Sequence, residues 1–595
     1  MKKLFSILIA LVVMLLNIVS CNVSNTEENV DLDSSSDIGY VTDLPSSEKS
    51  TEQIKETEKN DGGEENRDEN KEDDAEDKED KEEKEEDEEK EEDEEKEDQA
   101  LEPLPESSEG LWFVLNEDGK GYTLTSNHDC KSSELVVGQY NGLPVTAIAS
   151  TFRMRWTTSR ITIGHSVTEL HPENFVNIST SVTNITVQNG NSAYQGTGDC
   201  LVEIATRTLI LGSRSSIIPD DGSVTTIGKE SFRGLNGLVS IVIPDTVTVI
   251  EESAFHNCDS LNSVVLSKNL KSIGDRAFEI SDLAGKLIIP EGVTYIGRNA
   301  FLGSKLSSVT IPSTIKDIAD AAFCTTPLES VTISPGVVSI GKSAFASCAM
   351  LESIVIPEGV TVIEEDAFAD CSSLKKFSIP NSLERIPVLS IMFLNSRELE
   401  YNEYGGGYYL GNDTNPYVCL SRRVNSSVPF TEIHPETRII SASSLSSVTG
   451  NVFIPKKVHW IHEEAVTPKQ RDQITSLSVD KDNPVYHSTS NCVIESATGT
   501  IVLGNSSSVI PNVETVTVIG TKAFWGSKVT VIDIPKNIKK IQTLALAYCS
   551  NLEIINYGGT VDEWKAIEKE KDWNDETKNY VVKCTDGKIS KAEDK

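Results

Sequence analysis

The chain has 595 residues, and 93 acidic against 54 basic side chains give it a formal net charge of −39. Residues 51–100 alone contribute −20 of this charge, so the other 545 residues carry −19, which leaves no basic footprint for nucleic acid and repels polyanions. Apolar residues, mostly Val, Ile and Leu, make up 38% of the chain, and this composition favours β-structure over a bundle of helices.

The N-terminus has the pattern of an export signal. Two lysines precede an apolar run, Leu4–Leu16, which is shorter than a membrane-spanning helix. The run ends in Ile18–Cys21 (IVSC), which resembles a bacterial lipoprotein signal, in which the cysteine is lipidated and becomes the mature N-terminus. We expect residues 1–20 to be a signal peptide and Cys21 to carry a lipid that holds the exported protein at the outer membrane or cell surface. A plain secretory signal with an incidental cysteine is the alternative.

Residues 21–106 form a linker with almost no large apolar side chains after Tyr40. Its central part, Lys71–Asp98, consists almost entirely of Glu, Asp and Lys. Such a segment cannot bury enough apolar surface to offset the entropy of ordering it. We therefore expect a disordered acidic linker that acts as a stalk.

A repeat of 22 or 23 residues follows the linker. Each unit contains L-x-x-I-x-I-P, whose alternation predicts a short strand that the proline ends. The unit continues as V-x-x-I-G-x-x-A-F, which predicts a turn and a tight helical or 3-10 segment. Because one unit cannot bury its apolar face alone, the repeat predicts a solenoid of stacked units. The aligned aromatic residues are Phe232, Phe255, Phe278, Phe301, Phe323, Phe345 and Phe368.

Three segments interrupt the repeat. Residues 182–232 and 474–524 match at a constant offset of 292, as Tyr194 matches Tyr486, and each predicts an inserted β-hairpin. The third, Glu400–Pro416, is rich in Gly and Tyr and predicts a projecting loop. The expected organisation is an N-terminal entry segment at 107–151, a solenoid at 152–556 with insertions at 182–218, 395–430 and 474–510, and a C-terminal exit segment and tail at 557–595.

The repeat also carries a family resemblance. The motif C-x-x-L-x-x-I-x-I-P-x-x-V-x-x-I-x-x-x-A-F, which is seen at Cys348–Phe368, resembles the BspA-type (Treponema pallidum-class) bacterial leucine-rich repeat over roughly residues 110–584. The resemblance implies a curved leucine-rich-repeat solenoid, mainly parallel β with short helical or 3-10 turns. It also implies cell-surface display and binding to proteins or host components, and it implies no shared catalytic residue.

One motif suggests nucleotide binding. Gly336–Ser343 fits the phosphate-loop pattern G-x-x-x-x-G-K-S. The same frame recurs at 291–301 and 358–368 with other residues, so the glycines belong to the repeat and Ile340 to the core. A 22-residue unit also lacks the flanking strand and long helix of a phosphate loop. We expect no nucleotide ligand.

The cysteines and histidines predict no metal or cofactor site. Cys258, Cys348, Cys371 and Cys549 sit in equivalent places of the repeat and predict small buried side chains. Cys348 and Cys371 fall on adjacent units, where an exported protein can form a disulfide. His459 and His462 lack a third metal ligand and predict surface positions. With no catalytic signature, the chain is expected not to be an enzyme.

The outward positions of the predicted strands form a candidate concave binding face. Two interpretations stay open, cohesion of the sheet by β-branched side chains and a binding surface for a partner. The candidate residues are Ser240, Val242, Ser263, Val265, Lys286, Ile288, Ser308, Thr310, Ser330, Thr332, Ser353, Val355, Lys376 and Ser378.

The sequence thus predicts a lipid-anchored bacterial surface protein that binds a protein or surface polymer in an adhesion-type role. A passive envelope scaffold or spacer is one alternative. The substrate-binding accessory of a surface enzyme is another, and it would require a deep pocket, for which the Tyr401–Tyr417 loop is the best candidate.

Overall fold

The structure is a computed structural model that describes the chain from residue 101 onward with short gaps. Cys21, the signal peptide and the linker up to residue 100 lie outside the described residues. Every described residue belongs to the second of the chain's two units, Lys96–Lys595. The described residues are 101–154, 157–175, 182–386, 396, 398–423, 428–446 and 448–594.

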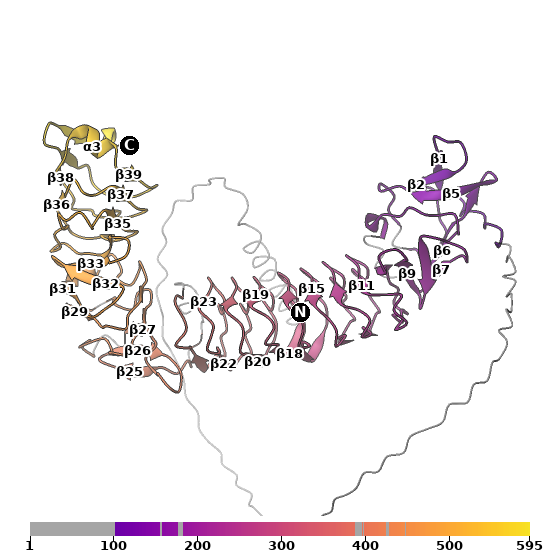
Figure 1. The fold of residues 1–595 in the computed structure, drawn as a ribbon, viewed down its shortest axis with the longest axis horizontal. Helices are drawn as coiled ribbons and strands as arrows, with labels where there is room; N and C mark the ends of the chain where they lie inside the picture. The colour runs from indigo at the N-terminus through magenta and orange to yellow at the C-terminus, as the bar shows by residue number, and fades with distance from the viewer. Residues whose placement is uncertain are drawn as a thin grey trace, which may run out of the picture. The chain divides into compact units, whose positions relative to one another are not determined.

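The central coils of the solenoid each contribute two parallel strands, one of three to seven residues and one of two. Figure 1 shows the longer strands along one side of the coils and the two-residue strands along the other. The longer strands are β12 (Ser240–Val242), β14 (Ser263–Val265), β16 (Ala284–Ile288), β18 (Lys305–Ile311), β20 (Ser330–Ile333), β22 (Ser353–Val355) and β24 (Lys376–Ser378). The two-residue strands are β11 (Thr226–Ile227), β13 (Val249–Ile250), β15 (Ser272–Ile273), β17 (Tyr295–Ile296), β19 (Asp317–Ile318), β21 (Ser339–Ile340) and β23 (Val362–Ile363).

The segment that follows each two-residue strand differs from the expected helical or 3-10 form. Its residues two before and two after the phenylalanine have positive φ, as at Ser253 (57°) and Asn257 (57°). This alternation turns every second N–H toward the next coil, so that Phe255 N–H donates to the Ala277 carbonyl at 2.7 Å. A continuous helix would point all its N–H groups along its own axis and leave the neighbouring coil unbonded. The segments are therefore stacked turns that extend the inter-coil hydrogen bonding.

The seven aligned phenylalanines form one continuous stack in the core, as the repeat predicts. Neighbouring ring centroids lie 4.8–5.5 Å apart with interplanar angles of 3–14°. All seven side chains are at most 1% exposed. The common interior of the coils thus dictates the identity of the repeat residues.

All three insertions have the same architecture, a three-stranded antiparallel meander whose last strand joins the ladder of two-residue strands in parallel. The segment Glu400–Pro416, expected as a projecting loop, instead supplies two strands of such a meander. The same set of hydrogen bonds occurs in both copies of the segment duplicated at offset 292. In each, one asparagine side chain, Asn191 or Asn483, accepts two backbone N–H groups and donates to two carbonyls. The meanders are β8 (Tyr194–Thr197), β9 (Cys200–Glu203) and β10 (Thr208–Leu211); β25 (Asn402–Tyr404), β26 (Gly407–Leu410) and β27 (Cys419–Arg423); and β32 (Tyr486–Thr489), β33 (Cys492–Glu495) and β34 (Thr500–Leu503).

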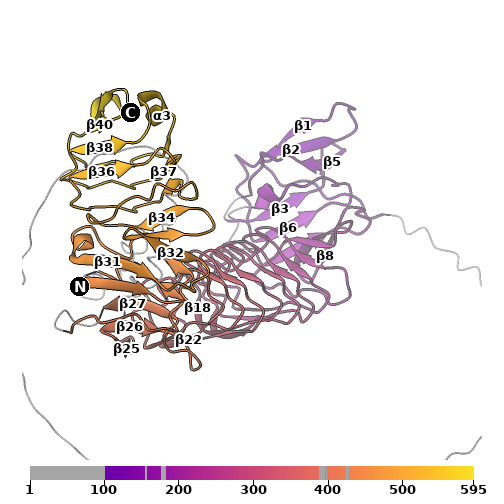
Figure 2. The ribbon, with the colours of Figure 1, turned by 60° about the vertical axis from the view of Figure 1, so that its left-hand side comes forward.

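The remaining elements lie before the first meander and after the second (Figure 2). The N-terminal ones are β1 (Trp112–Leu115), β2 (Tyr122–Ser126), β3 (Glu134–Val137), β4 (Gln139–Tyr140), β5 (Leu143–Ile148), β6 (Arg160–Ile163), η2 (Pro172–Phe175) and β7 (Asn184–Val187). The later ones are β28 (Ile439–Ile440), β29 (Gly450–Ile454), β30 (Trp460–Ile461), η3 (Arg471–Gln473), β31 (Ile474–Val479), β35 (Val518–Ile519), β36 (Val531–Ile534), β37 (Lys540–Ile541), β38 (Ile554–Tyr557), α3 (Val561–Lys565), β39 (Glu568–Lys569), β40 (Val581–Lys583), β41 (Lys588–Ser590) and η4 (Lys591–Glu593). Among the described residues, none of the helices has the length and hydrophobicity needed to traverse a bilayer.

Residues 101–108 pack along the first coils as a strap, although most of them fall within the predicted disordered linker at 21–106. The strap packs against three glycines that are 26 residues apart. Strap atoms occupy the space that a Cβ atom would need at each of them: Pro105 at Gly138, Leu104 at Gly164 and Leu101 at Gly190. Ser107 and Ser108 N–H groups donate to the Gln139 and Val136 carbonyls, both at 3.0 Å. The strap therefore covers the otherwise open edge of β3.

Candidate binding surface

The fourteen predicted face residues lie on the longer strands, two on each, and we call their exposed side the long-strand face. The pairing aligns them as expected, for example Ser308 with Ser330 and Thr310 with Thr332. β12 and β14 pair only with each other, and β16, β18, β20, β22 and β24 form a separate sheet. The register of this face therefore follows from the repeat, with one break between β14 and β16.

Apolar side chains stand exposed on the long-strand face. The exposed fractions are 62% for Val242, 55% for Val265, 59% for Ile288 and 66% for Val355. The residue just before each of these in its strand points inward, and Ile354 is 2% exposed. Since one apolar residue recurs per coil on most of these strands, they form a stripe along the stacking direction, continued through the middle coils by threonines.

Charge is distributed unequally between the two sides of the coils. The long-strand face carries Lys286 and Lys376 and no carboxylate among its fourteen residues. The stacked turns instead carry carboxylates that pair with bases on neighbouring coils, such as Glu365 with Lys342 at 3.0 Å. The same pattern joins Glu252 with Lys229 at 2.8 Å. The long-strand face is thus a neutral to weakly basic surface on an acidic chain.

The phosphate-loop pattern at Gly336–Ser343 is part of this charged ladder. The Lys342 backbone N–H donates to the Asp320 carboxylate at 2.9 Å, and its ammonium pairs with Glu365. Ile340 is fully buried, and a Cβ at Gly341 would lie 2.7 Å from the Ile318 carbonyl oxygen. The carboxylates of Asp320 and Glu365 thus already bind the N–H and ammonium groups that a phosphate would need. Two coils approach each other so closely at Gly341 that only glycine fits there.

The repeat cysteines are buried free thiols, including Cys348 and Cys371. Each donates to the carbonyl of a phenylalanine on the preceding coil, as Cys371 does to Phe345 at 3.3 Å and Cys348 to Phe323 at 3.3 Å. Burial raises the pKa of the Cys348 thiol to about 12, so the reactive thiolate is suppressed. These cysteines satisfy core carbonyls, a task that Thr326 performs in the same column.

The prediction of surface positions for His459 and His462 is wrong for His462, which is buried, whereas His459 is half-buried. His462 is 5% exposed, and its Nδ1 accepts the Glu464 backbone N–H at 2.9 Å. His459 Nε2 lies 3.2 Å from the Leu383 carbonyl oxygen and 3.1 Å from that of Glu384, on a coil 75 residues earlier. Both therefore support the packing. Among the described residues, no group of three or more His, Cys, Asp or Glu side chains is placed to hold a metal ion.

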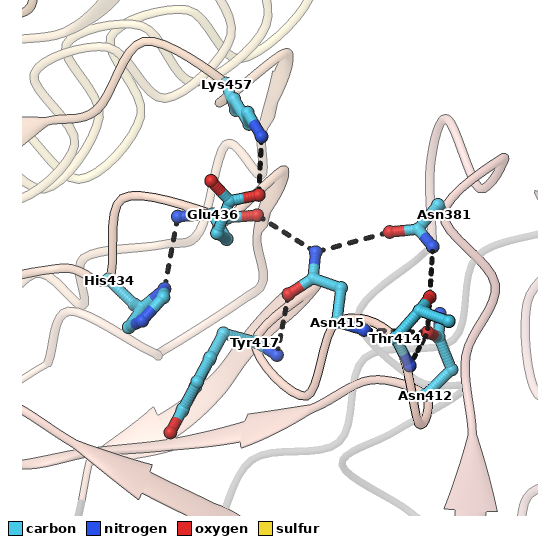
Figure 3. Close-up of polar contacts among 8 residues, drawn as sticks. All are labelled: Asn381, Asn412, Thr414, Asn415, Tyr417, His434, Glu436 and Lys457. Atoms are coloured by element: carbon cyan, nitrogen blue, oxygen red, sulfur yellow. Dashed lines mark hydrogen bonds and ion pairs between the residues drawn. The ribbon is translucent and has the colours of Figure 1, made fainter.

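A cluster of polar residues joins the central coils to those after the second meander (Figure 3). Asn415 donates to the Asn381 side chain and to the Glu436 carbonyl, both at 3.2 Å, and accepts the Tyr417 N–H at 3.1 Å. Asn412 donates to the Ile379 carbonyl at 2.8 Å, which ties the loop to the end of β24. Sequence reasoning missed this cluster; the run of Asn and Pro at 412–416 was the available signal, because asparagine side chains often bond turn backbones.

Aromatic rings gather on the same meander. Tyr417 stacks on His434 with centroids 3.8 Å apart, and Arg422 lies over the Tyr401 and Tyr408 rings at 4.6 and 5.4 Å. These contacts engage the half-buried rings with one another and with the arginine. The segment therefore acts as a packed joint between coils, and it contributes Asn412, Thr414, Asn415 and Tyr417 to the polar cluster of Figure 3.

Comparison with known proteins agrees with the repeat. Residues 213–324, 282–400 and 505–567 match the model of the BspA type leucine rich repeat region, with six copies in all. No curated protein sequence matches the chain. The comparisons indicate no catalytic family.

Several solved bacterial structures are similar at low identity. A leucine-rich cell-surface protein from Faecalibacterium prausnitzii is 20% identical over 78% of this chain and 98% of its own, with a TM-score of 0.23. A leucine-rich repeat protein from Treponema pallidum is 20% identical over 46% of this chain and 91% of its own, with a TM-score of 0.20. One from Bacteroides ovatus is 16% identical over 80% and 98%, with a TM-score of 0.27. Because these scores are low, the assignment rests on the repeat match and the coil geometry: residues 213–400 and 505–567 are leucine-rich repeats of the BspA type.

Proposed function

We propose that this protein is a non-catalytic, lipid-anchored surface protein that binds another protein or a surface polymer through the long-strand face. The observation that carries the proposal is the exposed stripe of Val242, Val265, Ile288 and Val355 on a face without carboxylates. Exposed apolar stripes of this kind are typical of interaction sites, and solenoids present them as extended surfaces.

Side-chain size supports the same proposal. Most of the other positions of the face hold Ser or Thr, whose short side chains allow the backbone of a partner to approach the sheet closely. Lys286 and Lys376 give the partner's acidic groups a contact at two places. The two lysines lie on different strands, β16 and β24, so we expect them to orient the partner rather than to supply most of the affinity.

The binding experiment replaces threonines at the centre of the face with arginine. We expect Thr310→Arg with Thr332→Arg to weaken binding at least about tenfold, because two long cations would obstruct the face and would have to be desolvated. The readout is the amount of ligand captured by immobilised protein from cell-surface extracts, followed by a dissociation constant for the ligand identified.

A matched control places the same charges elsewhere on the coils. Thr294→Arg with Val338→Arg changes two exposed residues that precede β17 and β21, next to the two-residue strands. Binding should survive this change. Equal binding by the wild type and both variants would contradict the role of the long-strand face.

Anchoring is tested separately at Cys21. Protease treatment of intact cells should release the repeat region, and the mass of the mature N-terminus should correspond to a lipid-modified residue 21. A Cys21→Ser variant should be found unprocessed or shed into the medium. An unmodified mature N-terminus at another residue would refute the lipid anchor while leaving the binding proposal intact.

A further inference from the structure

A cavity of about 650 Å³ lies at the C-terminal end of the described chain, bordered by α3, β39 and η4. Its apolar wall includes Ile567 and Trp573, which are 6% and 5% exposed. The rest of its lining is polar and contains Lys565, Lys571 and Lys591. A volume of this size matches that of pockets for small organic molecules.

The carboxylates of the cavity already have partners. Glu570 pairs with Lys540 at 2.8 Å and accepts the Thr543 N–H at 2.9 Å. Asp594, which is 8% exposed, accepts the Trp564 indole N–H at 2.7 Å and the Tyr580 hydroxyl at 3.0 Å. Lys569 also lies 3.4 Å from Asp594. Within the cavity, these contacts neutralise both acids.

Three lysines of the lining form no direct ion pair, although Glu593 is close enough to Lys565 for their charges to interact. Lys565, Lys571 and Lys591 form no ion pair with any described residue, and Lys565 and Lys571 are exposed. Lys591 donates to the Thr577 carbonyl at 2.7 Å, which fixes its ammonium at the rim. Three cations around a partly apolar cavity attract an anion, while the net charge of the chain repels a polyanion.

Behind the cavity wall, Lys569 and the buried Trp564 and Trp573 contact one another. Lys569 Nζ donates to the Trp564 carbonyl at 2.9 Å and lies 4.5 Å from the centre of the Trp564 ring. Burial lowers the pKa of Lys569, and Asp594 opposes that shift. Trp564 is fully buried and packs against Trp573 with ring centroids 6.2 Å apart. A ligand would therefore meet a preformed wall of aromatic and aliphatic groups.

We propose that this cavity binds a small organic anion, a carboxylate or phosphate carried on a body of about the size of a sugar. The anionic group would contact Lys565, Lys571 and Lys591, and the body would pack against Trp573 and Ile567. The inference is independent of the long-strand face and of lipid anchoring.

The test is calorimetric titration of the full chain with glucuronate, glucose 6-phosphate and glucose. We expect saturable binding of at least one of the two anions and no binding of glucose. Lys565→Gln with Lys571→Gln should weaken anion binding on the order of tenfold, because two of the three cations would be lost. These two side chains are exposed, so the fold should be unaffected, and thermal unfolding of the variant checks this.

The matched control removes two lysines outside the cavity. Lys583→Gln with Lys588→Gln lowers the charge equally, on β40 and β41, and should leave binding unchanged. Equal weakening by both pairs would mean that the general charge of the region, and not the cavity, attracts the anion. That result, binding of glucose with the same affinity as the anions, or no binding of either anion at millimolar concentration would each overturn the proposal.

Discussion

The central coils and the coils after the second meander share one backbone pattern but have different cores. In the central coils each stacked turn places a phenylalanine in the ring stack, as Phe301 lies between Phe278 and Phe323. In the later coils the equivalent column holds Leu445, Val466, Phe524 and Leu546. The backbone bond nevertheless persists, since Leu546 N–H donates to the Trp573 carbonyl at 2.8 Å. The coils are thus held together by the hydrogen bonds between their turns in both regions, and the stacked phenylalanine rings add to this in the central coils.

The later coils also contain a buried cation, whereas the core of the central coils is apolar and its polar groups are neutral. Arg471 is 1% exposed and donates to the carbonyls of Gly504 and Ala523 at 3.1 and 2.5 Å. Burial lowers its pKa to about 10. The inserted meander takes the place of a regular coil here, and the arginine adds a second donor to the Ala523 carbonyl, which also accepts the Gly504 N–H at 2.9 Å. The buried cation thus bridges the third meander and the coil after it, a role that no charged residue has in the central coils among the described residues.

The largest expected effect comes from breaking the ring stack. Phe301→Ala should cost about 3–5 kcal/mol, because it removes a fully buried ring and leaves a cavity between two others. Hydrogen exchange should show the loss in the central coils around residues 278–323, since each coil contacts only its neighbours. Leu546→Ala is the matched change in the later coils. Identical exchange patterns for the two variants would show that the two regions unfold as one unit.

A smaller effect is expected at Ile280, a β-branched residue with φ of 53°. The same column holds Asn257 and Gly303, which tolerate this conformation. Ile280→Asn should therefore stabilise the central coils by about 1 kcal/mol, measured by chemical denaturation. The reverse change, Asn257→Ile, should destabilise them by a similar amount. If both changes were neutral, packing of the Ile280 side chain would compensate for its backbone strain.

The smallest effect is a pH dependence that arises from two histidines of the later coils. Burial lowers the pKa of His434 and His462 below 6.5, so the unfolded chain takes up protons first as the pH falls. Stability from the neutral imidazoles is complete above pH 6.5 and declines below it. In both residues Nδ1 accepts a backbone N–H two residues on, a bond that protonation removes.

Asparagine can replace that acceptor, as Asn412 does for the Thr414 N–H at 3.0 Å. The double variant His434→Asn with His462→Asn should thus keep its stability at pH 7 and lose less than the wild type at pH 5. Thermal unfolding at both pH values, together with hydrogen exchange to locate the change, measures this. An unaltered pH dependence would assign the acid sensitivity to other groups.

Much of the structure of the central coils was predictable, because a given position of the repeat has the same surroundings in every coil. The Ile and Phe columns, the strand register and the outward positions all follow from a period of 22 or 23 residues. The conformation of the stacked turns was not predictable, because the positions with positive φ, such as Glu230 and Asp366, are not occupied by glycine or any other single residue type that would indicate it. The second meander, β25–β27, was missed for a related reason: its Gly- and Tyr-rich sequence does not match the other two.

The sequence repeat was therefore sufficient to predict a residue's contacts wherever that residue packs against the equivalent residues of the two neighbouring coils. Contacts between unlike segments required three-dimensional coordinates, because no periodicity links their residues. The strap over Gly138, Gly164 and Gly190, the bond from His459 to a coil 75 residues earlier, and the lysine-lined cavity are of this kind. In each of them the partners come together only after the coils have stacked, so their chemistry is a property of the folded chain.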